Sequence, residues 1–107
     1  MAAKKVLVMG LDYGINANVC NVLRNENFEP FGFVFNAGDV ENEIARVISV
    51  VSQNKFDGAV IGHGVQKNPE LLQRVTQSIS ETDGSVKLIL VSGPSAVLSD
   101  TRSALSN

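Results

Sequence analysis

His63, the sole histidine of the chain, stands between Gly62 and Gly64 at the end of an apolar run. Histidine changes charge near neutral pH, so this residue could act as a general acid or base or donate a hydrogen bond to a ligand. The flanking glycines permit positive φ angles and the close approach of another molecule. A simpler alternative, an exposed loop histidine tolerated between two glycines, stays open.

Asn68 and Pro69 follow the histidine and have the residue types of a helix start. We expect Asn68 as the N-cap and Pro69 as the first helical residue. The free N–H groups of that first turn should then point back toward the loop of residues 62–68. Such a loop suits a small polar or anionic ligand.

A second loop, residues 10–14, is bounded by Gly10 and Gly14 and follows the first apolar run. Asp12 could orient the histidine or accept a hydrogen bond from a ligand, but it could equally cap the next helix. Tyr13, the sole tyrosine, could stack on a ligand or hydrogen-bond to it, or it could pack over the loop.

The elements that must position these loops alternate along the chain. Continuous apolar runs predict buried strands at residues 6–9, 31–35, 56–62 and 86–91. Apolar residues at helical spacing predict helices between the strands and after the last one, and the second and third start at Val40 and Pro69. The inward positions include Ile15, Val22 and Ile48.

Four strand–helix units predict an α/β domain over residues 1–107, with three layers and a four-stranded parallel sheet of order 2-1-3-4. This is a flavodoxin-like or receiver-like fold, in which ligands bind outside the carboxyl ends of the strands where the order reverses. That switch point lies between strands one and three. The two glycine-bounded loops should face each other there, with Ser92 alongside, where it could bond an anionic oxygen or cap the last helix.

Composition excludes several classes of protein. The 9 Lys+Arg and 11 Asp+Glu residues are spread without blocks, so neither a nucleic-acid stripe nor a polybasic membrane anchor is present. A single cysteine, Cys20, excludes an internal disulfide, and its place beside an apolar helix stripe favours packing. One histidine and scattered acids offer no metal-ligand spacing. The first apolar run is too short for a signal peptide or a membrane span, so we expect a cytoplasmic protein.

Known nucleotide and phosphotransfer motifs do not fit. The Gly62-x-Gly64 pair lacks the third glycine of a dinucleotide fingerprint, and no P-loop occurs, so no cofactor is expected. A phosphorylated receiver would need an aspartate at Gly62 and an acidic pair where Asp12 stands alone. Sugar-phosphotransferase IIB domains place a cysteine where this chain has Gly10 or Leu11, so that resemblance concerns the fold only.

Residues 56–71 read Phe-Asp-Gly-Ala-Val-Ile-Gly-His-Gly-Val-Gln-Lys-Asn-Pro-Glu-Leu, and residues 92–95 read Ser-Gly-Pro-Ser. Together they resemble a group of small uncharacterised bacterial and fungal α/β proteins, over roughly residues 55–105. The resemblance implies the fold and the importance of residues 62–70, but it implies no activity. The group has glycine where this chain has His63, which weighs against a catalytic role.

We therefore predict that the chain binds a small polar or anionic molecule at the switch point. The expected binding residues are Gly10, Asp12, Tyr13 and Gly14 on one wall, Gly62, His63, Gly64 and Asn68 on the other, and Ser92 beside them. One alternative is an interaction module, such as a homodimer built on the apolar edge of strand four. Another is a small enzyme that uses His63 with Asp12 for acid–base chemistry.

Overall fold

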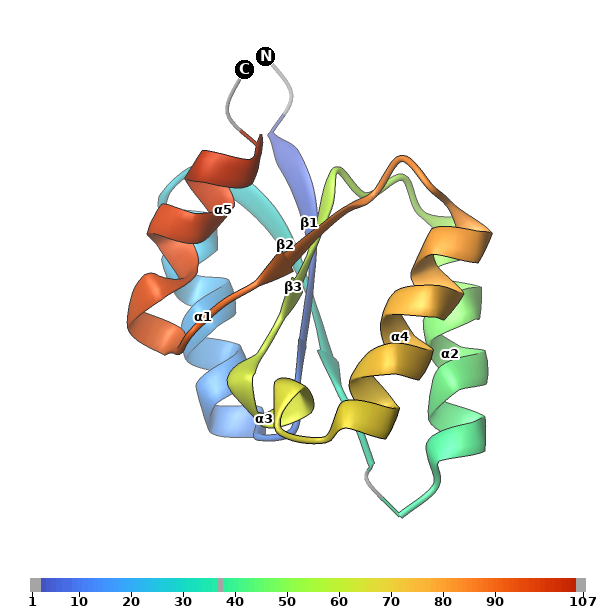
Figure 1. The fold of residues 1–107 in the computed structure, drawn as a ribbon. Helices are drawn as coiled ribbons and strands as arrows, with labels where there is room; N and C mark the ends of the chain where they lie inside the picture. Colours follow the sequence, from blue (N-terminus) through green and yellow to red (C-terminus); the bar gives the residue numbers. More distant parts are fainter. Residues whose placement is uncertain (1–2, 37, 106–107) are drawn as a thin grey trace.

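The computed structural model describes residues 3–36 and 38–105, which form a twisted sheet between two layers of helices (Figure 1). The strands are β1 (Lys4–Gly10), β2 (Phe28–Val34), β3 (Gly58–Ile61) and β4 (Lys87–Leu90). The helices are α1 (Tyr13–Asn25), α2 (Val40–Gln53), α3 (His63–Gln66), α4 (Pro69–Thr82) and α5 (Val97–Leu105), with a 3₁₀ turn, η1, at Pro94–Ala96.

All neighbouring strands of the sheet pair in parallel, in the order β2-β1-β3-β4. This confirms the predicted α/β class and strand order. Leu7 of β1 lies opposite Phe31 of β2 on one side and Ala59 of β3 on the other. The chain leaves the carboxyl end of β1 toward one face of the sheet and that of β3 toward the other, which creates the switch point.

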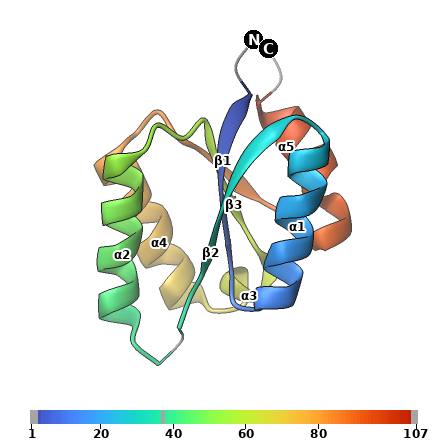
Figure 2. The ribbon, with the colours of Figure 1, turned by 180° about the vertical axis from the view of Figure 1, so that it is seen from behind.

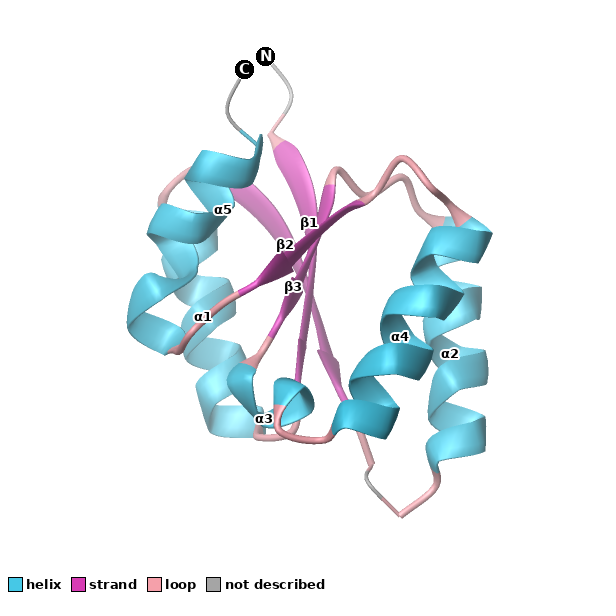
Figure 3. Ribbon diagram, in the orientation of Figure 1, coloured by secondary structure: helices cyan, strands magenta, loops and turns pink. Residues whose placement is uncertain are grey.

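Two helices cover each face of the sheet: α1 and α5 on one face, and α2 and α4 on the other (Figures 1 and 2). Figure 3 shows the same three layers by element type. Side chains of β1 alternate between the layers, since Val6 and Val8 belong to the α1–α5 core and Leu7 and Met9 to the α2–α4 core. A strand buried on both faces must be continuously apolar, as this run is.

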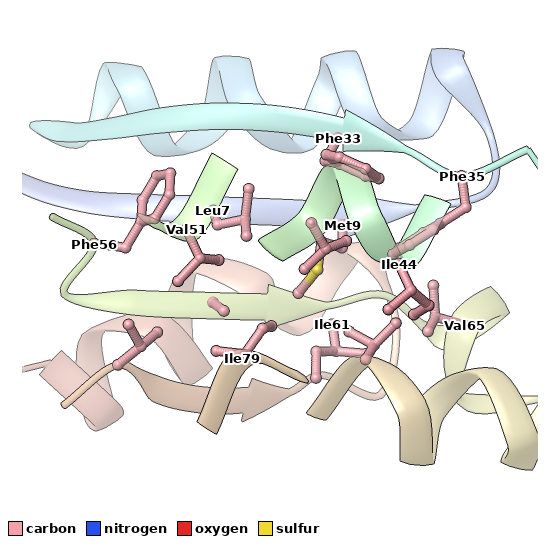
Figure 4. Packing of buried hydrophobic residues seen from close by; sticks show 14 of the residues in the cluster. Leu7, Met9, Phe33, Phe35, Ile44, Val51, Phe56, Ile61, Val65 and Ile79 are labelled. Carbon is pink, nitrogen blue, oxygen red and sulfur yellow. The ribbon is translucent and has the colours of Figure 1, made fainter. Parts of the chain in front are cut away.

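The larger core lies between the sheet and the α2–α4 pair (Figure 4). Ile44 and Val51 of α2 and Ile79 of α4 converge on Leu7 and Met9 of the central strand. All five side chains are buried. Burial of such side chains stabilises a fold by about 1.5–3 kcal/mol each, so this layer holds α2 and α4 in place.

The predicted helix starts and stripes are largely confirmed. Asp39 caps α2 by accepting a hydrogen bond from Asn42 N at 3.3 Å, and Asn68 caps α4. Three predicted inward residues are exposed, however: Ile48 on α2, and Ile15 and Val22 on α1. Each follows or precedes a buried residue by one position, and one residue turns a helix by about 100°, which carries the side chain off the inward face.

The strand boundaries differ from those predicted. β1 and β2 are longer than expected, and β3 and β4 are shorter. Pro30 directly precedes the predicted second strand, residues 31–35, but lies within β2. The amide of Phe35 donates to Gly10 O at 2.9 Å, and by alternation the nitrogen of Pro30 faces away from β1. No N–H is needed there, so this edge strand tolerates a proline.

Within residues 3–36 and 38–105, no helix combines the length and the apolarity needed to cross a membrane.

Candidate functional site

The chain between β3 and α4 begins with a helical turn, α3, where the sequence predicted a loop over residues 62–68. Gly62 is the N-cap of this turn, and Gln66 N donates to Gly62 O at 3.2 Å. Val65 is fully buried in the α2–α4 core. Its apolar side chain holds the turn against the sheet, which explains why the segment is helical. In Figure 1, α3 lies beside the start of α1, at the carboxyl ends of β1 and β3.

Gly62 is required by close packing and not by backbone conformation. Its amide donates to the carbonyl oxygen of Met9 at 2.9 Å, and a Cβ on Gly62 would lie 2.9 Å from that same oxygen. No glycine in the described part of the chain has a φ in the left-handed region, so the positive φ that Gly62 and Gly64 permit is not adopted there. β1 and the start of α3 are simply too close for a side chain.

A pocket of about 140 Å³ opens at the carboxyl ends of β1 and β3, on the face covered by α1 and α5. Its lining is predominantly apolar. The floor is made by five buried valines that come from β1, β3, the residue after β4, and helices α1 and α5: Val8, Val19, Val60, Val91 and Val97. The mouth is made by the segments that leave β1, β3 and β4, including Leu11, His63 and Pro94. The pocket thus lies at the switch point of the sheet.

Asp12 and His63 are the ionisable residues that line this pocket. Asp12 is the N-cap of α1, and its Oδ1 accepts a hydrogen bond from Ile15 N at 2.9 Å. His63 is the first residue of α3, and its side chain is exposed. In the described part of the chain no hydrogen bond joins the two side chains. Asp12 therefore has the capping role, and none of the described residues is hydrogen-bonded to the imidazole.

Some of the predicted site residues come together at the pocket and others do not. Those that line it are Gly10, Asp12, Gly62, His63 and Gly64. Tyr13 is 79% exposed and lies outside it, and Gly14 is inside α1. Asn68 is beyond α3, where it accepts a hydrogen bond from Leu71 N. Ser92 is exposed, and because Gly93 precedes η1 without a side-chain cap, Ser92 does not cap that turn.

The apolar character of the mouth was missed from the sequence. Leu11 and Ile15 are both exposed large apolar residues, and both line the pocket with Pro94. A signal was present, because Leu11 directly follows Gly10 where a polar loop residue would be ordinary. Ile15 fits the helical spacing of the core residues. It lies in the first turn of α1, however, where its side chain is 49% exposed.

Two side-chain amides hold the strand ends around the pocket. Asn16 is buried, and its Nδ2 donates to Val8 O at 3.0 Å. Gln66 Nε2 donates to Ile61 O at 2.9 Å and to Val91 O at 2.6 Å, which joins the end of β3 to the chain after β4. Backbone carbonyls at the ends of strands need such partners when they are shielded from water.

Cys20 lies next to this region but takes no part in the lining. The side chain is buried in α1, and its Sγ is 3.7 Å from Asn16 Oδ1. Burial raises the pKa of the Cys20 thiol, and the charge of Arg24 offsets this only in part. The thiolate is the reactive form of cysteine, so Cys20 has a packing role, as predicted.

Tyr13 lines a different, shallow hollow at the β2 edge, together with Arg46 of α2. The guanidinium of Arg46 lies 4.6 Å from the ring centroid of Phe33, and Arg46 Nη1 is 2.8 Å from Glu43 Oε1. The same carboxylate accepts a hydrogen bond from Asn36 N at 2.8 Å. The carboxylate of Glu43 thus neutralises the charge of Arg46. Among the described residues that line this hollow, no unpaired cation is left to bind an anion.

Across residues 3–36 and 38–105, no three His, Cys, Asp or Glu side chains are grouped so that they could hold a metal ion. No family model, curated protein or solved structure matches the chain. The resemblance of residues 55–105 to small bacterial and fungal α/β proteins stays a prediction. The pocket and its lining are therefore what bears on function.

Proposed function

We propose that this protein binds a small amphipathic molecule at the switch point, with the apolar end of the ligand in the pocket and its polar or anionic end at the mouth. The observation that supports this is the apolar lining of a pocket of about 140 Å³. An engineered apolar cavity of about 150 Å³ stays dry and binds benzene. A phenyl ring or a short branched chain therefore matches the available space.

The lining narrows the kind of polar ligand that the sequence predicts. A hydrated anion such as phosphate would lose water against the valine floor without gaining enough hydrogen bonds, which costs several kcal/mol. A carboxylate attached to an apolar group avoids this cost, because its charge stays in water at the mouth. The exposed imidazole of His63 stands at that mouth and can donate a hydrogen bond to it.

Binding has more support than catalysis by His63 and Asp12. A general base is usually held by a second group that orients its ring, as in nucleophilic triads. Here the Oδ1 atom of Asp12 accepts from Ile15 N, and no hydrogen bond to His63 is present in the described part of the chain. We also propose a cytoplasmic location, supported by the lone, buried and unbridged Cys20.

Titration followed by ¹H–¹⁵N NMR tests the proposal with four probes: benzene, phenylacetate, acetate and inorganic phosphate. We expect saturable shift changes with benzene and phenylacetate, centred on residues 10–15, 62–64 and 93–97. Acetate and phosphate should leave these amides unchanged. Saturation by phosphate or acetate alone would instead favour a wholly polar ligand, and a lack of response to benzene would show that the pocket takes no apolar group.

A further inference from the structure

The two edges of the sheet differ in how they are protected. An edge strand presents unpaired N–H and C=O groups, and monomeric proteins commonly protect it with proline or charged residues. β2 carries both, in Glu29 and Pro30. β4 pairs with β3 on one side only, and its last three residues are Leu88, Ile89 and Leu90. The β4 edge therefore lacks a proline, and its one charged residue is Lys87 at the start of the strand.

The hydrogen-bonding groups of this edge can be assigned from the register. The amide of Lys87 donates to Asp57 O at 3.2 Å, so Lys87 faces β3. Along a strand the direction alternates, which makes Leu88 and Leu90 present their N–H and C=O groups away from the sheet. These groups form a short, regular template for another strand.

The side chains beside the template are apolar. Leu88 lies opposite Ala59 and Leu90 opposite Ile61, and both of these partners belong to the α2–α4 core. Leu88 and Leu90 therefore lie on that face of the sheet, together with Leu72 of α4. Leu72 and Leu88 are only partly buried, and Leu90 is 50% exposed. In Figure 1, β4 runs in front of the sheet and α4 stands to one side of it.

We propose that the β4 edges of two copies of this chain pair in antiparallel fashion about a twofold axis and join the two sheets into one. With the axis at Ile89, Leu88 of one copy lies opposite Leu90 of the other. Both residues have outward-facing backbone groups, so each such pair exchanges two N–H···O=C bonds. The leucine side chains of the two copies then cover one another on the α4 face, as a self-complementary twofold interface requires.

The charges of the edge also permit this pairing. Lys87 is the ionisable residue of β4, and in this register it lies opposite Val91 of the second copy. The ammonium group of Lys87 donates to Ala104 O of its own α5 at 3.0 Å, so it already points back to its own chain. Like charges across an antiparallel pair destabilise it, and none face each other here.

Sedimentation equilibrium from micromolar to millimolar concentration tests the proposal. We expect the native chain to approach twice its mass of 11.4 kDa. Leu90→Glu should be monomeric, because it buries a carboxylate in the interface. Val22→Glu is the matched control, since Val22 is similarly exposed at 44% but lies on α1, and it should dimerise like the native chain. Circular dichroism and thermal melting establish that both variants are folded.

Amide hydrogen exchange identifies the interface independently of mass. The amides of Leu88 and Leu90 should become protected as concentration rises, whereas the amide of Ile89 should be protected at every concentration. A native chain that stays monomeric at millimolar concentration would overturn the proposal. So would a dimer in which the Leu88 and Leu90 amides exchange as fast as they do at low concentration, because its interface would lie elsewhere.

Discussion

Ile15 shows how much a single residue controls at this site. Its side chain lines the pocket mouth and is 49% exposed, so it borders both the apolar floor and water. Val22 lies seven residues later on the same helix face and is similarly exposed, but it is outside the pocket. Substitutions at these two positions can therefore be compared to distinguish an effect on the pocket from an effect on α1.

Replacement of Ile15 by tryptophan should block the pocket. The larger ring can cover the mouth without entering the core, so the fold is retained and the affinity for benzene should fall by about tenfold or more, equivalent to 1.4 kcal/mol. NMR titration measures this affinity directly. Val22→Trp should bind benzene as the native chain does. Equal affinity in native and Ile15→Trp proteins would show that benzene binds elsewhere.

Thr101 lowers the stability of the fold, because its buried hydroxyl has no hydrogen-bond partner among the described residues. Its side chain is fully buried in α5. A buried hydroxyl without a partner costs about 1–3 kcal/mol. Thr101→Val, which keeps the shape and removes the hydroxyl, should therefore raise the free energy of unfolding by about 1 kcal/mol.

Urea denaturation measures this change, and Thr76→Val provides the control. Thr76 lies on α4, where its hydroxyl donates to Leu72 O at 2.9 Å within the same helix, so removal of this hydroxyl should bring no gain in stability. A loss of stability in Thr101→Val would mean that its hydroxyl is hydrogen-bonded in solution.

At the scale of elements, α2 and α4 are joined by an ion pair above their shared core. Arg74 Nη1 lies 2.5 Å from Glu41 Oε1, and Arg74 Nη2 lies 3.0 Å from Glu41 Oε2. Hydrogen bonding to Arg74 lowers the pKa of the Glu41 carboxyl. Because the folded-state pKa is the lower one, the pair stabilises the fold above the ordinary glutamate pKa. That contribution is lost as pH falls through the lowered value.

Replacement of Arg74 by glutamine should raise the pKa of Glu41 toward that of an isolated glutamate. A carbon-detected NMR titration of the side-chain carboxyl measures it. Arg24→Gln on α1, which removes a cation that does not contact Glu41, should leave this titration unchanged. A Glu41 titration unaffected by the loss of Arg74 would show that the ion pair does not persist in solution. Since both side chains reach into water, we expect only a small change in stability.

Element starts were well predicted where one side chain determines them. Asn68 caps α4, as its residue type and place before Pro69 indicated, and Asp39 caps α2 directly before its predicted start at Val40. α3 was missed because a single turn has no periodicity to detect, and what makes it helical is the burial of Val65 and the hydrogen bonds of Gln66 to two strand ends. Such contacts depend on the whole fold and leave no local pattern.

At the scale of the whole molecule, alternation was enough to predict the parallel sheet and its order. The position of the pocket follows from that order, because the chain leaves β1 and β3 toward opposite faces. The lining chemistry was not predicted, since Val8, Val60 and Val97 look like ordinary core residues in the sequence. Only the way the fold places them below the segments that leave β1, β3 and β4 makes this part of the core the floor of a pocket.

Global unfolding can be followed through Cys20, the sole cysteine. Its thiol is buried, and burial raises its pKa, so iodoacetamide should reach it only when the chain unfolds. The native protein should react roughly a thousandfold more slowly than glutathione, because unfolded molecules make up about one in a thousand or fewer. Mass spectrometry measures the rate, and urea should raise it. Alkylation at the rate of glutathione without urea would show that α1 opens locally.

The amide of Gln66 has a consequence for how the molecule responds to what it binds. One side chain holds both the segment beside the pocket and the chain directly after β4. A ligand that displaced α3 would move Gln66 and so change its hydrogen bond to Val91 O, directly after β4. Thermodynamic reciprocity then requires that, if a ligand strengthens the pairing of two copies, the pair must in turn bind that ligand more tightly by the same factor.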